Sequence, residues 1–416
     1  MTALVVAGEM IFTLPFVLAR VFRPTLLDVF GLTNLQLGTA FSLYGVVAMA
    51  SYFPGGPLAD RFSARWLMTA ALVATSLGGC IFATIPTLGL LTAIYAFWGL
   101  TTILLFWAAL LLATREWGGE AAIGRAYGIL DGGRGLVSAL LASVMVLIFA
   151  ALLPAEVASA TLAQRTSALS SVIWIVTGLT LGSAVLVWFA VPPASASESP
   201  TGSPRFSWNG VRQVLAMPAI WFQAAIVVCA YVGYKATDDF SLYARDAFGY
   251  NEVAAAQLGT VSFWVRPFAA VGAGYLADKT RPSRVAAWSF AALALGCLLM
   301  VLQPGIYAVL VATVAATSVG IYAVRSVYFA LLGEARVPLA VTGSAIGLVS
   351  VIGYTPDVFM GPVMGYLLDR SPGALGHQHV FLFVAGFAVV GLIATLLFQR
   401  FAETPPQRHR EVIGAR

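Results

Sequence analysis

Twelve long apolar runs constrain this chain more than any other feature of its sequence. A helix needs about 20 mostly apolar residues to cross the hydrocarbon of a bilayer, and each run is about that long. Only 10% of the 416 residues are charged, whereas a soluble domain carries about a quarter. The sequence therefore predicts an all-α polytopic membrane protein with spanning helices near 4–26, 34–57, 66–85, 88–113, 127–152, 169–191, 218–243, 253–277, 284–302, 305–332, 340–367 and 378–401.

A polar break divides these runs into two groups of six. Residues 192–217 are rich in Pro, Ser and Gly, a composition typical of a flexible linker that cannot bury enough apolar surface to fold alone. Two six-helix groups joined in this way are the arrangement expected of parallel transporter repeats. We expect an N-terminal six-helix half at 1–191, a cytoplasmic linker at 192–217, a C-terminal six-helix half at 218–402 and a cytoplasmic tail at 403–416.

The sequence contains traces of an internal duplication. The segment Gly56-Pro-Leu-Ala-Asp-Arg ends the second run, and Gly274-Tyr-Leu-Ala-Asp-Lys ends the eighth, at an offset of 218 positions. At an offset of 219, Gly124-Arg-Ala-Tyr-Gly matches Gly343-Ser-Ala-Ile-Gly. Two matches at nearly the same offset favour pseudo-repeats over chance.

The distribution of Arg and Lys predicts the orientation, because cytoplasmic loops carry the excess of these residues. With both termini in the cytoplasm, fourteen basic residues fall on the cytoplasmic side and five on the outer side. The net charge of +5 is then explained without a nucleic-acid partner. The first run lacks the features of a cleaved signal peptide and is interpreted as a retained helix. Since Arg greatly outnumbers Lys, we expect a bacterial protein of the cytoplasmic (inner) membrane.

One loop resembles a family signature. Gly56-Pro-Leu-Ala-Asp60-Arg61, with the trailing Arg65, resembles the G-x-L-x-D-R motif of the major facilitator superfamily, and the copy at Gly274 falls where that family repeats it. The resemblance covers essentially the whole chain and implies a monomeric secondary transporter that works by alternating access. It also implies that the loop is a cytoplasmic latch, in which the aspartate sits near the positive N-terminus of a neighbouring helix. That role is carried to Asp60, Arg61 and Asp278; the alternative is a solvated basic loop that serves orientation only.

Two further comparisons concern the subfamily. Many proton-coupled members carry an arginine in helix four, four residues before a glycine, whereas Tyr95 occupies that position before Gly99 here. Helix seven, from Tyr231 to Tyr243, is similar to that of the organophosphate/anion transporter branch, which holds an anionic headgroup with basic residues in helices one and seven. The helix-seven arginine of that branch would fall nearer Gly233 than Lys235, so the register differs.

Charged residues inside the spans are candidate functional groups, because each costs at least about 2.5–3.5 kcal/mol at the bilayer centre. Depth along each helix places Lys235 and Arg266 close to the midplane, where such transporters bind substrate. We therefore expect a substrate site that holds an anionic group, such as a carboxylate, phosphate or sulfonate. The candidate substrate-binding residues are Lys235, Arg266, Arg325, Arg134 and Arg20. In the alternative, neighbouring acids neutralise these bases and the pairs gate or staple the helices.

Acidic residues in the spans are the candidates for gating or for carrying a coupling proton. They are Glu9, Asp131, Asp238, Asp239 and Asp357, and the gate or staple role is favoured for each. Asp131 and Arg134 are spaced i, i+3 on one helix and could pair directly.

These features predict a secondary active transporter of a small, anionic organic solute in the lipid bilayer, without a cofactor or a metal. The alternatives are an exporter of apolar or cationic compounds, and a transporter-like sensor. No ATP-binding loop occurs, so pumping must draw on a gradient, but the coupling ion is not specified. His377, His379 and His409 lie outside the predicted spans and are interpreted as polar loop groups rather than ligands. An enzyme is disfavoured, because the spans contain no convergent constellation of reactive side chains.

Overall fold

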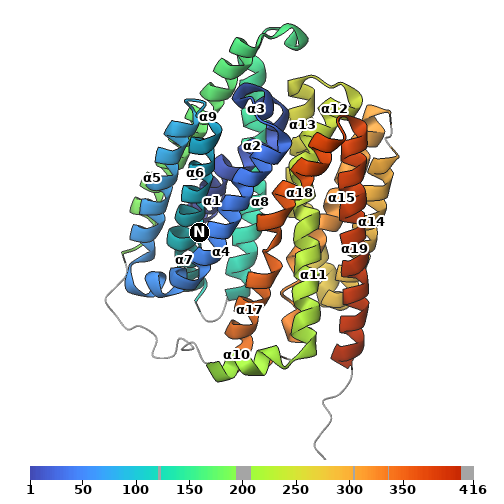
Figure 1. The fold of residues 1–416 in the computed structure, drawn as a ribbon. Coiled ribbons are helices and arrows are strands. Elements are labelled where there is room, and N and C mark those ends of the chain that lie inside the picture. Colours follow the sequence, from blue (N-terminus) through green and yellow to red (C-terminus); the bar gives the residue numbers. More distant parts are fainter. Residues whose placement is uncertain (120–122, 194–207, 303–304, 336, 404–416) are drawn as a thin grey trace, which may run out of the picture.

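Helices occupy all twelve predicted runs in the computed structural model, which describes residues 1–119, 123–193, 208–302, 305–335 and 337–403 (Figure 1). Within those residues, eleven helices are long and apolar enough to span a membrane. The remaining run is α13 (Glu252–Lys279), a 28-residue helix that carries charges at both ends and Arg266 in its middle. It packs within the bundle against α8 and α15. The all-α polytopic fold expected from the sequence is therefore confirmed.

The first six runs fold into helices joined by short turns, and we refer to residues 1–191 as the N-terminal half. Two of the runs contain a π-helical turn, η1 and η2. The elements are α1 (Thr2–Phe12), η1 (Thr13–Val17), α2 (Leu18–Val21), α3 (Arg23–Phe30), α4 (Asn34–Arg61), α5 (Ala64–Phe82), α6 (Leu88–Gly99), η2 (Leu100–Trp107), α7 (Ala108–Gly118), α8 (Ile123–Leu152), η3 (Val157–Ser159) and α9 (Leu162–Ala190).

We refer to residues 218–402 as the C-terminal half, a division that remains a prediction. Most of the expected linker, 194–207, and the tail, 404–416, lie outside the described residues. The elements are α10 (Trp208–Leu215), α11 (Pro218–Lys235), η4 (Ala236–Asp239), α12 (Phe240–Phe248), α13, α14 (Pro282–Val301), α15 (Tyr307–Val327), α16 (Leu331–Glu334), α17 (Leu339–Gly353), α18 (Pro356–Arg370) and α19 (Ala374–Glu403).

Three spans are broken near the middle of the bundle, and each break has a local cause or consequence. Pro15 lies in η1, where a residue without an N–H interrupts the helical ladder. Pro356 is at the start of α18, so the carboxylate of Asp357 falls in the first turn of that helix, where the helix dipole favours negative charge. The 3-10 turn η4 separates α11 from α12 and carries Asp238 and Asp239. Broken helices of this kind line the binding sites of many transporters.

The two halves meet along two helix pairs, α4 with α18 and α8 with α13. Glycines allow the first pair to touch through its backbones, since a methyl group on Gly38 would collide with the carbonyl group of Gly361, and one on Gly365 with the backbone of Asn34 and Leu35. Close approach through small residues is the usual way for helices to pack in lipid. These contacts lie at the end of the bundle that contains the α3–α4 and α18–α19 turns, the end predicted to face outside and called the outer end below.

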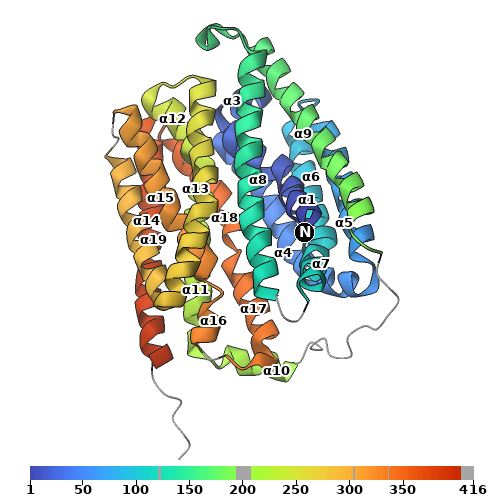
Figure 2. The same cartoon turned by 180° about the vertical axis from the view of Figure 1, so that it is seen from behind.

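Polar contacts also tie the halves together at the outer end. Arg245 reaches Asp28 at 3.0 Å, and Arg165 reaches Glu252 at 2.7 Å. The carboxylate of Asp369 accepts hydrogen bonds from the first backbone N–H groups of α4, including that of Leu35 at 2.8 Å. Figure 2 shows that the opposite ends of α8 and α13 lie farther apart than their outer ends. The structure is therefore closed at its outer end.

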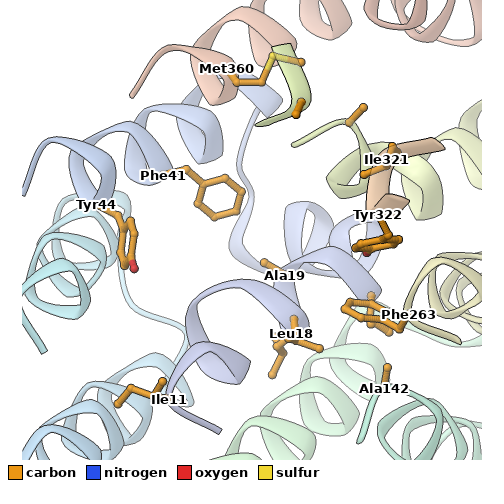
Figure 3. Close-up of a cluster of buried hydrophobic side chains, with 14 of the residues drawn as sticks. Ile11, Leu18, Ala19, Phe41, Tyr44, Ala142, Phe263, Ile321, Tyr322 and Met360 are labelled. Atoms are coloured by element: carbon orange, nitrogen blue, oxygen red, sulfur yellow. The ribbon is translucent and has the colours of Figure 1, made fainter. Parts of the chain in front are cut away.

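An apolar layer lies beneath these contacts. Figure 3 shows Leu18 and Ala19 of α2 between Phe41 of α4 and Phe263 of α13, and all four side chains are buried. Since α2 belongs to the N-terminal half and α13 to the C-terminal half, the layer seals the interface between the halves against water from the outer side.

Candidate functional site

Four charged residues form a cluster where α1, α8 and α13 converge, which we call the inner cluster: Glu9, Asp131, Arg134 and Arg266. Arg266 reaches Asp131 at 3.2 Å and Glu9 at 3.7 Å, while Arg134 reaches Glu9 at 3.5 Å. The guanidinium of Arg134 also lies over the rings of Phe12 and Trp107. The Asp131 side chain is 58% exposed, so the inner cluster is open to solvent on one side.

A second group, the outer cluster, lies where α2 meets the end of α11, η4 and the start of α18: Arg20, Lys235, Asp238 and Asp357. Asp238 accepts a hydrogen bond from Nε of Arg20 at 2.7 Å, and its other oxygen lies 3.4 Å from Nζ of Lys235. The same ammonium group lies 3.4 Å from Asp357. The side chains of Arg20, Lys235 and Asp238 are at most 7% exposed. Because Arg20 and Asp238 belong to different halves, this buried pair fastens the halves together.

The 3-10 turn η4 explains how two adjacent aspartates serve different partners. Asp238 points across the interface to Arg20, whereas Asp239 points into its own half, where Oδ2 lies 2.7 Å from Nδ1 of His377. The two are both buried, so each carboxylate must find its partner inside the protein.

Tyr234 connects the outer cluster with a further arginine. Its ring lies close to two guanidinium groups, that of Arg20 at 4.6 Å and that of Arg325 at 3.6 Å from the ring centroid. Nη1 of Arg20 donates a hydrogen bond to the Tyr234 hydroxyl at 3.3 Å. Arg325 also lies 5.4 Å from the ring of Tyr231. Aromatic faces attract cations by about 0.5–2 kcal/mol, but they do not neutralise them.

The charges of this region do not cancel. Each cluster holds two cations and two carboxylates. Of the five cations predicted to lie in the spans, Arg325 is the one without a carboxylate at ion-pair distance among the described residues. The two clusters and Arg325 together therefore carry one positive charge in excess, placed on a guanidinium that rests on tyrosine rings.

The latch candidates lie at the cytoplasmic ends of α4 and α13. Asp60, Arg61 and Asp278 are all exposed. Within the part of the chain that the structure describes, neither Asp60 nor Asp278 makes an ion pair or a side-chain hydrogen bond. Among the described residues, the two latch aspartates are therefore unpaired, while ion pairs fasten the outer end; the latch role remains a prediction.

The five candidate substrate-binding cations thus fall into three places. Lys235 lies with Arg20, Asp238 and Asp357, and Arg266 lies with Arg134 and Asp131, while Arg325 stands apart on the tyrosines. The direct pairing considered for Asp131 and Arg134 is replaced by one between Asp131 and Arg266 of the other half. The roles assigned to these residues remain predictions.

Sequence reasoning missed or misplaced several groups. His377 was predicted to be a polar loop group, but α19 begins at Ala374 and buries this imidazole completely, so that interpretation was wrong. Tyr234 was not a candidate, although a tyrosine next to Lys235 in a predicted span was a visible signal. Glu9 was named only among the acids, yet it contacts two arginines of the inner cluster.

Comparison with known proteins identifies the family. The model of the major facilitator superfamily matches residues 5–355. The chain belongs to the major facilitator superfamily. It is 27% identical to the inner membrane protein YqcE of Escherichia coli (strain K12), over 96% of this chain and 95% of that protein, and 25% identical to the inner membrane protein YihN of the same organism, over 99% and 97%.

A solved structure shares the fold of this superfamily member. The nucleoside transporter NupG, as a D323A mutant, superposes with a TM-score of 0.74 over 95% of this chain and 98% of that chain, at 14% sequence identity. Family membership makes the chain a multi-pass membrane protein and a secondary transporter of a small solute rather than an enzyme, and its relatives are bacterial inner membrane proteins. The residues that select the solute are therefore expected between the two halves.

Proposed function

We propose that this transporter moves a small organic anion and that Arg325 holds the anionic group. The observation that carries the proposal is the unmatched charge of Arg325. A charge that no carboxylate neutralises within a membrane span is costly, so it persists where a ligand supplies the opposite charge. A guanidinium offers a planar fork that matches two oxygens of a carboxylate, phosphate or sulfonate.

The tyrosines around Arg325 support a substrate with a further organic part. Tyr231, Tyr234 and Tyr354 belong to one connected group of ring contacts, with centroids 5.4 Å and 5.0 Å apart. Tyr322, also in contact with Tyr234, has a buried hydroxyl without a hydrogen-bond partner in the described structure. These rings and hydroxyls provide apolar faces together with hydrogen-bonding groups next to the cation.

The other four cations take different parts in this proposal. Arg266, partly exposed within the inner cluster, is the second contact for the anion, because Asp131 is exposed enough to release it to a ligand. Arg134 keeps Glu9 neutralised. Lys235 and Arg20 are held by the buried Asp238 and, for Lys235, also by the partly buried Asp357, and they fasten the outer end, which supports the gating role that the sequence left open for them.

The similarity to the organophosphate/anion branch supports an anionic substrate class but no particular substrate. Both arrangements place cations on helices one and seven, here Arg20 and Lys235. Among the described residues of this chain, the span cation that pairs with no carboxylate is instead on the tenth span, at Arg325. We therefore expect selection for an anion without expecting the substrate of that branch.

A ligand screen by thermal stability tests the proposal. Purified protein in detergent is heated with panels of organic anions, cations and apolar drugs, and the melting temperature is recorded. A ligand at 100 times its Kd stabilises by about 2.7 kcal/mol. Loss of a charge-assisted hydrogen-bonding partner costs about 1.5–3 kcal/mol of affinity, so at the same concentration Arg325→Gln should keep between about a tenth and a half of the stabilisation.

The controls separate the charge from the fold. Arg325→Lys retains the charge but not the fork and should weaken the shift less than Arg325→Gln. Ser326→Ala, on the neighbouring exposed residue whose hydroxyl bonds its own helix, should leave it unchanged. If cations or apolar drugs stabilise the protein and anions do not, the exporter alternative replaces this proposal.

A further inference from the structure

A buried histidine outside the proposed substrate site is held between two carboxylates. His377 lies on the first turn of α19 and is 0% exposed. Its Nδ1 is 2.7 Å from Oδ2 of Asp239, and its Nε2 is 3.4 Å from Oδ2 of Asp246. The three residues come from η4, α12 and α19, all within the C-terminal half at the outer end.

A neutral imidazole carries one N–H proton and two carboxylates carry none, and this geometry requires one proton more. A neutral histidine has one N–H donor and one lone pair, whereas the charged form has two N–H donors. With an oxygen anion at each ring nitrogen, a neutral ring would direct its lone pair at one of them. The arrangement is satisfied when a further proton resides on the ring or on one of the two carboxyl groups.

The charge count around His377 leads to the same result. Asp239 and Asp246 contribute two negative charges, and Arg245, which reaches Asp246 at 2.9 Å, contributes one positive charge. Arg245 also faces Asp28 at 3.0 Å, so Asp239 and Asp246 keep at least one negative charge that an added proton would balance. In addition, Oδ1 of Asp239 is buried and lacks a hydrogen-bond partner in the described structure, so this carboxylate has an oxygen free to take the proton.

The other elements packed against His377 do not supply that charge. From α12, the ring of Tyr243 lies 5.4 Å away, and its hydroxyl donates to the carbonyl group of Met300 in α14. The neighbouring Gln378 donates to the carbonyl group of Val301. The charged residues of α18 at this end, Asp369 and Arg370, bond the start of α4 and Tyr366 instead.

The site has a path to the outer side. The side chain of Asp246 is 24% exposed, whereas those of His377 and Asp239 are fully buried. A proton from outer water can therefore reach Asp246, pass to Nε2 of the ring, and leave Nδ1 for Asp239 without entering the space between the halves. Asp246 also connects the site to the outer closure, because its partner Arg245 reaches Asp28 of the N-terminal half at 3.0 Å.

We propose that His377, Asp239 and Asp246 form a proton-binding site at the outer end, which takes one proton from outer water and holds it while that end is closed. In the described structure no group of three or more His, Cys, Asp or Glu residues is arranged to hold a metal ion. When the proton leaves, Asp239 and Asp246 carry one charge more than Arg245 can neutralise. Arg245 is then drawn more strongly to Asp246, and its contact with Asp28 weakens.

The dependence of thermal stability on pH tests this site without knowledge of the substrate. Melting is measured for wild type and His377→Gln from about pH 5 to about pH 9.5, between the ordinary carboxylate and lysine ranges. A group that binds a proton only in the folded state stabilises it below its titration and loses that contribution as pH rises. The unfolding equilibrium constant of wild type, divided by that of His377→Gln, should therefore increase with pH, by up to about tenfold per pH unit.

Matched variants make the outcome decisive. His379→Gln removes a histidine two positions away that has no hydrogen bond or ion pair in the described structure. The difference in stability between this variant and wild type should not change with pH. Asp246→Asn, at the partly exposed end of the path, should reproduce the pH-dependent loss even if His377→Gln does not fold. A stability offset that stays constant across the pH range in the foldable variant would overturn the proposal, since a purely structural role predicts that result.

Discussion

Asp238→Asn should open the outer end, because Asp238 neutralises two buried cations at once. In the outer-closed structure Arg20 contacts it at 2.6 Å and Lys235 at 3.4 Å. The amide would keep the shape of the side chain but remove its charge. Asp357 alone would then face both cations, and it lies within ion-pair distance of Lys235 only.

The size of the effect follows from burial. The side chains of Arg20 and Asp238 are 2% and 7% exposed, so solvent screens the pair very little. Removing one partner of a buried ion pair costs about 3–5 kcal/mol. That cost applies to the outer-closed state, whereas in an outer-open state Arg20 and Lys235 would meet water. Since each 1.4 kcal/mol is a factor of ten, we expect the open-to-closed ratio to rise by about two to three orders of magnitude.

Distance measurement between spin labels checks this shift. Labels are placed on Ala155 and Leu375, which are exposed at the outer ends of the two halves, after replacement of Cys80, Cys229 and Cys297. Wild type should show a single short distance, and Asp238→Asn should add a longer one. Glu156→Gln, which removes a charge from an exposed outer turn, is the control. An Asp238→Asn distribution that matches wild type would show that the pair does not hold the outer end closed.

Three further predictions follow from the same structure. Gly361→Val should also lengthen the outer distance, because a side chain there would press on the backbone of Gly38; an unchanged distance would mean that α4 and α18 do not need to touch. In the Asp238→Asn background, the long-distance fraction should grow with pH and His377→Gln should remove that dependence, whereas persistence of the trend would place the responsible proton elsewhere. Asp60→Asn should slow transport more than it weakens ligand binding, and equal losses of both would argue against a latch.

The sequence predicted the fold because the thickness of the bilayer fixes the length of each apolar run. Five prolines in the predicted spans are candidate kinks, and only Pro15 and Pro356 lie at breaks, whereas Pro54, Pro267 and Pro362 lie inside continuous helices. The break at η4 has no proline or glycine and was not foreseen. Its position depends on the partners that receive Asp238 and Asp239 on opposite sides, and these are tertiary contacts.

The composition of the site was predicted in part, but its pairing was not. Intramembrane charges stand out in a sequence because they are rare, and every one of the five candidate cations lies near the interface between the halves. Which cation lacks a carboxylate depends on contacts such as that between Arg20 and Asp238, which are 218 positions apart. His377 shows a different limit. The last span was predicted to begin at 378, but α19 begins at Ala374, and this difference of four residues moves His377 from a predicted loop into a buried helical turn.

The central claim is that Arg325 holds the anion during transport, and uptake into proteoliposomes tests it most directly. The anion that gives the largest thermal shift is supplied in labelled form, and initial rates are measured over its concentration for wild type, Arg325→Lys, Arg325→Gln and Ser326→Ala. We predict a KM for Arg325→Gln that is raised by about ten- to a hundredfold, a smaller increase for Arg325→Lys, and wild-type values for Ser326→Ala. Saturable uptake by Arg325→Gln with the wild-type KM would contradict the account.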